Sequence, residues 1–122
     1  MLRHRPALAV ALGCLALLGG IRSAIPARAQ GRVIEVTVDG DHYAFSPARI
    51  EVQKDDVVKV TFRAKDIAHS FTLDAYRIAK RASAGQTVVF EFRADQPGSF
   101  PFYCNLVQDE RCKGMKGELV VR

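Results

Sequence analysis

Hydrophobic and polar residues alternate along most of the chain after position 30, and this alternation predicts short β-strands. The pattern is clearest at residues 58–62, where Lys59 and Thr61 separate apolar side chains, and at residues 87–93. Shorter examples occur at residues 32–38, 43–45, 50–52, 69–73, 100–104 and 119–121. We therefore expect seven or eight strands and no long helix in this part of the chain.

Turn-forming residues separate the predicted strands. Residues 39–41 read Asp-Gly-Asp, residues 95–98 read Asp-Gln-Pro-Gly, and Pro47 ends another apolar run. Many short strands with regular turns predict one all-β domain, an antiparallel Greek-key β-sandwich. The strand pattern alone fits an immunoglobulin-like sandwich equally well.

The first 29 residues have a different character, typical of a secretory signal peptide. Arg3 and Arg5 precede an apolar run at residues 7–18, and residues 27–29 read Ala-Arg-Ala, a small-residue cleavage site. We expect cleavage after residue 29, a domain over residues 30–122, no membrane span after cleavage, and a periplasmic or secreted location. Lipid attachment at Cys14 and retention as an N-terminal tether are alternatives.

The charge of the chain changes once this segment is set aside. Of the 18 basic residues, four lie in residues 1–29, whereas all 13 acidic residues lie beyond it. The remaining 14 basic and 13 acidic residues give a net charge of +1, so the sequence does not indicate nucleic-acid binding. At 122 residues the chain has room for one domain, which we expect to be a monomer.

Sulfur-bearing residues gather within residues 100–117. This stretch contains Cys104, Cys112 and Met115, and His69 begins an apparent strand upstream. Sulfur ligands select soft metals such as Cu(I), so one imidazole, two thiols and one thioether predict a copper site. In an exported protein the same two cysteines can instead form a structural disulfide.

Four sequence segments resemble the cupredoxin family. They are F-S-P-A-R-I-E-V at residues 45–52, His-Ser-Phe at 69–71, F-Y-C at 102–104 and M-K-G-E-L-V-V at 115–121. The chain is most similar to the copper domains of cytochrome c oxidase subunit II and nitrous-oxide reductase, and to small periplasmic relatives. This resemblance, over about residues 43–121, implies a cupredoxin-like sandwich with copper as its cofactor.

The predicted ligand loop departs from the family pattern at two positions. Dinuclear members have a cysteine, a second cysteine four residues on, a histidine eight residues on and a methionine eleven residues on. Here the corresponding residues are Cys104, Gln108, Cys112 and Met115. The resemblance implies His69, Cys104 and Met115 as metal ligands, and Cys112 is a candidate by its position and thiol. Because Gln108 supplies no bridging thiolate, we expect a mononuclear site.

Three functions are compatible with these residues. The first is an exported copper protein that transfers electrons between redox partners, and the second is a Cu(I) carrier or buffer that serves oxidase assembly or copper handling. The third is a metal-free β-sandwich binding module closed by a Cys104–Cys112 disulfide. No hydrolytic constellation or phosphate-binding glycine loop occurs, so we expect no enzymatic activity. We expect His42 to lie on the surface.

Overall fold

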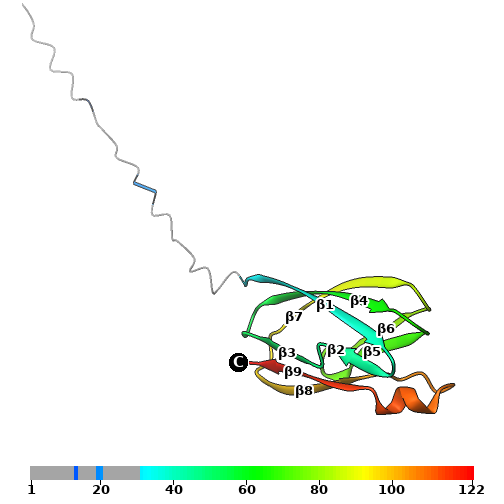
Figure 1. Ribbon diagram of the computed structural model, residues 1–122. Coiled ribbons are helices and arrows are strands. Elements are labelled where there is room, and N and C mark those ends of the chain that lie inside the picture. The colour runs from blue at the N-terminus through cyan, green and yellow to red at the C-terminus, as the bar shows by residue number, and fades with distance from the viewer. Residues whose placement is uncertain (1–12, 14–18, 21–30) are drawn as a thin grey trace, which may run out of the picture.

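Two β-sheets pack face to face in the computed structural model, which describes residues 13, 19–20 and 31–122 (Figure 1). One sheet has the order β2 (Ala44–Ser46), β1 (Val33–Asp41), β4 (Val57–Ala64) and β7 (Thr87–Arg93). The other has the order β3 (Arg49–Val52), β9 (Lys116–Val121), β8 (Gly98–Tyr103), β5 (His69–Leu73) and β6 (Ile78–Ala82). The predicted signal peptide lies almost wholly outside the described residues.

The predicted all-β sandwich is confirmed, but its sheets are mixed rather than wholly antiparallel. Strand β1 pairs in parallel with β4, and β3 pairs in parallel with β9, whereas the other strand pairs are antiparallel. Alternation along a strand reports which face is buried, but it carries no information about the direction of the neighbouring strand. The parallel pairs join strands distant in sequence, as the chain crosses between sheets after β2.

Inward-facing aromatic side chains from both sheets form the centre of the core. Phe71 and Phe102 stack with ring centroids 4.7 Å apart, and Phe45 meets Phe102 edge to face at 5.1 Å. Phe62 and Phe71 lie 6.0 Å apart, which links the two sheets. Burial of each such side chain contributes about 1.5–3 kcal/mol. These rings fix the relative positions of β5 and β8, the two strands that lead to the candidate site.

The chain between β5 and β7 is more regular than the sequence pattern indicates. It contains a 3-10 turn, η1 (Asp74–Tyr76), and the five-residue strand β6, which pairs with the whole of β5. Strand β6 lies at a sheet edge and exposes its three central residues, so hydrophobic alternation does not mark it. A second 3-10 turn, η2 (Glu110–Gly114), precedes β9. Within the described residues, no helix is long and apolar enough to cross a membrane.

One buried carboxylate lies away from the candidate site. Asp56 is 3% exposed, accepts a hydrogen bond from the Gln53 backbone N–H at 2.8 Å, and lies 3.3 Å from the Arg32 guanidinium. Burial acts to raise the pKa of Asp56, but these hydrogen bonds outweigh burial and hold the pKa below its usual value. The ionised form of Asp56 therefore stabilises the fold.

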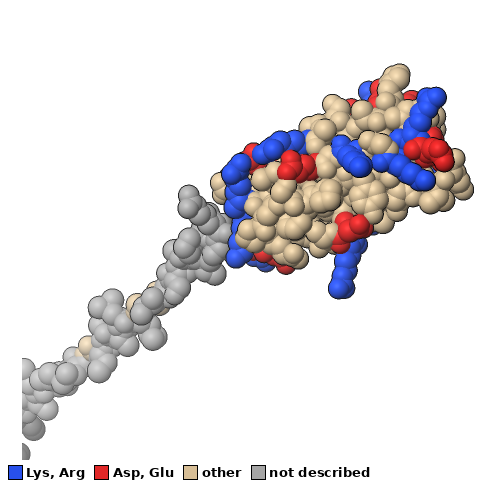
Figure 2. Space-filling model, turned by 90° about the horizontal axis from the view of Figure 1, so that it is seen from below, with Lys and Arg blue, Asp and Glu red and all other residues tan. Residues whose placement is uncertain are grey.

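Basic and acidic side chains are interspersed on the face of the molecule shown in Figure 2. They surround a largely uncharged surface and form no continuous patch of one sign on that face. On this face, the distribution agrees with the small net charge after residue 29.

Candidate metal site

The two cysteines of the sulfur cluster form a disulfide in the structure. Cys104 follows the last residue of β8, Cys112 lies within η2, and their Cα atoms are 5.2 Å apart. Each residue is 1% exposed. A bonded pair has no thiolate to offer a metal, so the predicted ligand role of these residues applies only to the reduced pair.

Both sulfur atoms lie against backbone N–H groups. The Ser70 N–H donates to Cys104 Sγ at 3.4 Å, and the Leu106 N–H donates to Cys112 Sγ at 3.1 Å. Such donors favour the charged form of an acceptor, so in the reduced state they would favour thiolates. The first of these bonds also places Cys104 Sγ against Ser70, the second residue of β5.

His69 is the first residue of β5 and is fully buried. Its Nε2 lies 2.6 Å from Asp66 Oδ1. Burial acts to raise the pKa of Asp66, but the hydrogen bond with His69 and two backbone N–H donors outweigh burial and hold the pKa well below its usual value. An ionised Asp66 accepts a hydrogen bond from Nε2–H, which leaves Nδ1 with its lone pair in the neutral ring. Nδ1 has no hydrogen-bond partner among the described residues.

Met115 ends η2 and is 1% exposed. Its carbonyl accepts a hydrogen bond from the Cys104 N–H at 3.2 Å, and its own N–H donates to the Cys112 carbonyl at 3.0 Å. The backbone of Met115 is thus bonded to both cysteines. The structure therefore brings the three predicted sulfur residues together at the end of the sandwich where His69 begins β5.

The turn between β1 and β2 covers the imidazole. The sequence predicted a turn at residues 39–41, but β1 continues through Asp41 and the turn comprises His42 and Tyr43. Gly40 lies against the His69 ring, and a Cβ atom at Gly40 would be 3.1 Å from it. The glycine is therefore needed for close packing, not for the turn. The His42 side chain is 88% exposed, so its predicted surface position is confirmed.

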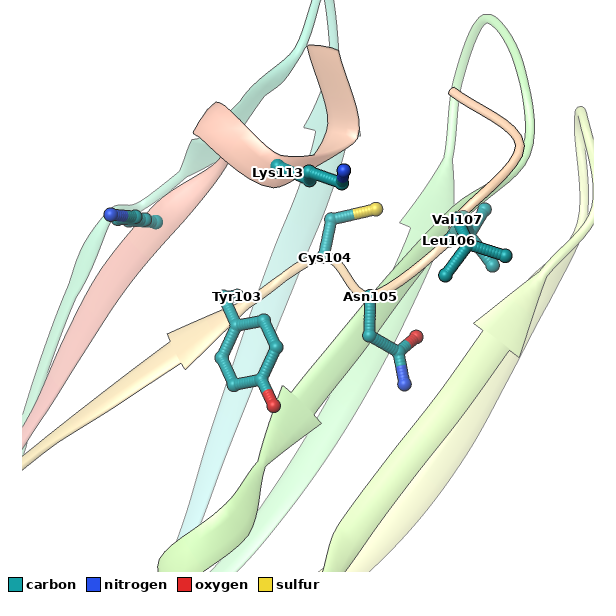
Figure 3. A pocket seen from close by; sticks show the side chains of 7 residues that line it. Tyr103, Cys104, Asn105, Leu106, Val107 and Lys113 are labelled. Atoms are coloured by element: carbon teal, nitrogen blue, oxygen red, sulfur yellow. The ribbon is translucent and has the colours of Figure 1, made fainter. Parts of the chain in front are cut away.

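A pocket of about 360 Å³ lies on the outer side of the cysteine loop (Figure 3). Tyr103 and Asn105 point away from the Cys104 sulfur in this view, and the Lys113 side chain lies on the same side as the sulfur. Leu106 and Lys116 also line the pocket. Cys104 is one of the lining residues of the pocket, and all four predicted ligands are buried.

The family model of the cupredoxin-like domain matches residues 8–121 of the chain. The chain belongs to this family. No curated protein matches the sequence. The predicted resemblance to cupredoxins is therefore confirmed for nearly the whole chain, including the strands and the loop that hold the sulfur residues.

Solved structures show the same cupredoxin fold. The periplasmic domain of cytochrome oxidase subunit II from Bradyrhizobium japonicum has a TM-score of 0.65 and 16% identity, covering 73% of this chain and 83% of that one. The metal-binding domain of a Cu(I)-exporting P-type ATPase from Streptococcus pneumoniae, solved with Cu(I), has a TM-score of 0.64 and 18% identity, covering 74% of this chain and 86% of that one. Auracyanin A, a blue copper protein from Chloroflexus aurantiacus, has a TM-score of 0.62 and 17% identity, covering 74% of this chain and 99% of that one.

The donor set of this cupredoxin fits a soft metal ion. One unpartnered imidazole nitrogen, two disulfide-bonded sulfur atoms that accept from N–H donors and one buried thioether are supplied by β5, the end of β8, η2 and its C-cap. Sulfur and imidazole ligands suit copper, and His69 has the carboxylate partner that orients many metal-binding histidines. Gln108 is exposed in the loop and is not part of this cluster.

Three residues around the site were not identified from the sequence. Asp66 orients His69, Tyr43 meets the His69 ring edge to face at 6.1 Å, and Asp109 is the N-cap of η2. An aspartate three residues before a candidate histidine ligand was a usable signal for Asp66. No sequence signal joins Tyr43 to this site, because its contact arises from the turn between β1 and β2.

Proposed function

We propose that this cupredoxin binds one copper ion when the Cys104–Cys112 bond is reduced, and that it transfers electrons between redox partners. The proposed ligands are His69 Nδ1, the sulfurs of Cys104 and Cys112, and the thioether of Met115. The observation that carries the proposal is the buried His69, whose Nδ1 has no hydrogen-bond partner among the described residues and which directly precedes Ser70, whose N–H contacts Cys104 Sγ. A buried polar atom without a partner costs about 1–3 kcal/mol, which metal binding would offset.

Each proposed ligand has a neighbour that fixes its position. Asp66 holds the His69 tautomer, and backbone N–H groups face both sulfurs. Copper, when bound, would supply one-electron redox chemistry. Because all four ligands are buried on a rigid sandwich, the protein would need little rearrangement when the charge of the site changes. A small rearrangement on change of charge supports electron transfer. It also supports copper binding, rather than enzymatic catalysis, as the function of the site.

Elemental analysis combined with thiol counting tests the proposal. We expect one copper per reduced chain, with the thiols of Cys104 and Cys112 both free before metal addition, and no tightly held copper in the oxidised chain. Cys112→Ser should weaken Cu(I) binding sharply and leave the fold intact, because Cys112 lies in η2 outside the aromatic core. Equal Cu(I) affinity of Cys112→Ser and the parent would remove Cys112 from the ligand set. Two coppers per chain would contradict a mononuclear site.

The disulfide itself favours a second candidate function. Two adjacent cysteines that can be oxidised together form a soft site suited to Cu(I), which supports a Cu(I) carrier or buffer for oxidase assembly or copper handling. Intense visible absorption after Cu(II) addition would support electron transfer, whereas colourless stoichiometric Cu(I) binding would support the carrier. If the reduced chain binds no copper, the remaining candidate is a metal-free binding module closed by the disulfide.

We further propose that the protein is exported and acts in the periplasm or outside the cell. The basic, apolar and small-residue segments of residues 1–29 support this location, and the disulfide is typical of an oxidising compartment. Mass spectrometry of the protein recovered from the periplasmic fraction should find Gln30 as the first residue. A cytosolic chain that retains Met1 would contradict export.

A further inference from the structure

The turn between β1 and β2 contacts both halves of the candidate site. On the imidazole side, the His42 N–H donates to Asp66 Oδ2 at 3.0 Å. The other oxygen of Asp66, Oδ1, is hydrogen-bonded to His69 Nε2. Asp41 pairs with Ala44 across the turn, so only two residues connect the strands. Both have positive φ angles, 50° for His42 and 58° for Tyr43. This tight turn fixes the direction of the Tyr43 side chain.

On the cysteine side, Tyr43 reaches the segment that carries Cys112. Its hydroxyl donates to Asp109 Oδ2 at 2.8 Å, and Asp109 Oδ1 accepts from the Arg111 N–H at 3.0 Å. Asp109 is the N-cap of η2, so one carboxylate joins the turn to the start of η2. The Arg111 guanidinium also lies 5.3 Å from the centre of the Tyr43 ring.

Few other hydrogen bonds anchor this segment. Within described residues 31–122, the Tyr43–Asp109 bond is the only hydrogen bond between residues 106–114 and a residue outside 104–115. When the disulfide is reduced, the covalent tie between Cys104 and η2 is also lost. With this tie gone, the bond to Tyr43 is the hydrogen bond that holds the segment with η2 against the turn between β1 and β2.

We propose that Tyr43 and Asp109 form a latch that holds Cys112 against Cys104 and so regulates the dithiol–disulfide balance of the site. The latch raises the effective concentration of one thiol near the other, which favours the disulfide over the open dithiol. The inference rests on the proposed function only in that the same cysteines are the proposed copper ligands. The balance itself is measured without copper.

The affected reaction is a two-electron exchange with a reference dithiol. Dithiothreitol gives two electrons and two protons, its sulfurs join as a cyclic disulfide, and the Cys104–Cys112 bond breaks to give two thiols. Because this hydrogen bond is made when Cys112 lies against Cys104 and is lost in the open dithiol, its removal should favour the dithiol about fivefold. For a two-electron couple this change makes the reduction potential about 20 mV less negative.

Tyr43→Phe is the direct test, because it retains the ring and removes only the hydroxyl. The copper-free protein is equilibrated with dithiothreitol at graded ratios of reduced to oxidised reagent, and free thiols are counted by mass spectrometry after alkylation. We expect the fivefold shift toward the dithiol. Tyr103→Phe is the matched control, since the Tyr103 hydroxyl also donates to a carboxylate at 2.8 Å, that of Asp74. It should leave the balance unchanged.

Two changes at Asp109 provide an independent comparison. Asp109→Ala removes the latch and should shift the balance at least as far as Tyr43→Phe. In Asp109→Asn the dithiol–disulfide balance should remain near that of the parent. The amide oxygen can accept a hydrogen bond from the Arg111 N–H while the NH₂ group donates to the Tyr43 oxygen. If Tyr43→Phe does not fold, this pair makes the same test.

The latch is refuted if Tyr43→Phe, or Asp109→Ala in its place, leaves the balance within twofold of the parent. An equal shift in Tyr103→Phe would also overturn it, because any lost tyrosine hydrogen bond would then have the same effect. Because no copper is used, failure of the latch leaves the copper proposal intact. Conversely, a reduced chain that binds no copper leaves the latch intact.

Discussion

Removing the carboxylate of Asp66 should weaken both the fold and copper binding. In Asp66→Ala, the buried Nε2–H of His69 loses its acceptor, which lies at 2.6 Å, and the His42 N–H loses its own. An unsatisfied buried donor costs about 1–3 kcal/mol, so we expect the copper-free protein to lose about 2 kcal/mol of unfolding free energy. Because the carboxylate also fixes the imidazole tautomer, we expect a loss of Cu(I) affinity of about 10- to 100-fold.

Competition with a chromophoric Cu(I) chelator measures this affinity on the reduced protein, and urea unfolding measures the stability. Asp39→Ala is the control, because Asp39 pairs with Arg63 at 2.6 Å on the surface and does not contact His69. It should cost at most about 1 kcal/mol and leave Cu(I) affinity unchanged. Asp66→Asn should be intermediate, since its amide oxygen still accepts from Nε2–H. Parental Cu(I) affinity in Asp66→Ala would refute the ligand role of His69 Nδ1.

Three further outcomes follow from the structure. The folded-state pKa of Asp56 is lowered from 3.8, so the stability that ionised Asp56 contributes is present above pH 3.8 and is lost as the pH falls further. Urea unfolding should therefore give a smaller unfolding free energy at about pH 3 than at about pH 7, and Asp56→Asn should reduce this difference. A Cβ at Gly117 would overlap the buried Phe102 ring, so Gly117→Ala should cost about 3 kcal/mol in urea unfolding, while Gly114→Ala, with open space around it, should cost less than half as much. Cys112→His should give a ligand set closer to blue copper and a visible Cu(II) absorption band; a colourless Cu(II) complex would contradict this.

The fold was predictable where burial alternates and less so elsewhere. Residues 58–62 and 87–93 lie in β4 and β7 because one face of each strand packs into the core. Strand β6 was missed, since at the sheet edge its exposed Lys80 and Arg81 obscure the pattern. The parallel pairing of β1 with β4 was also missed. It depends on how the chain crosses between the sheets, which local periodicity does not encode.

The candidate site was predictable as a set of residue types but not as a chemical state. His69 and the three sulfur residues are identifiable in the sequence as potential donors to a soft metal. All four are buried, and the disulfide and backbone hydrogen bonds join the three sulfur residues. Whether Cys104 and Cys112 are thiols or a disulfide depends on the distance between their sulfurs and on the available reductant, and the sequence specifies neither. The Tyr43–Asp109 contact spans 66 positions and arises only when the β1–β2 turn meets η2.

If Cys112 is a copper ligand as proposed, a cysteine at this position, where the resemblance to dinuclear cupredoxins implies a histidine, would couple metal binding to thiol oxidation. An imidazole at this position could not form a bond with Cys104, whereas a thiol held at the same place can. The contacts that would hold Cys112 for a metal, namely the Leu106 N–H and the Tyr43–Asp109 bond, also hold it for the disulfide. Better positioning of the Cys112 thiol therefore favours both the metal-bound state and the disulfide, and it does not select one over the other. The choice falls to the supply of reductant and of copper, so occupancy of this site should report the redox condition of its compartment.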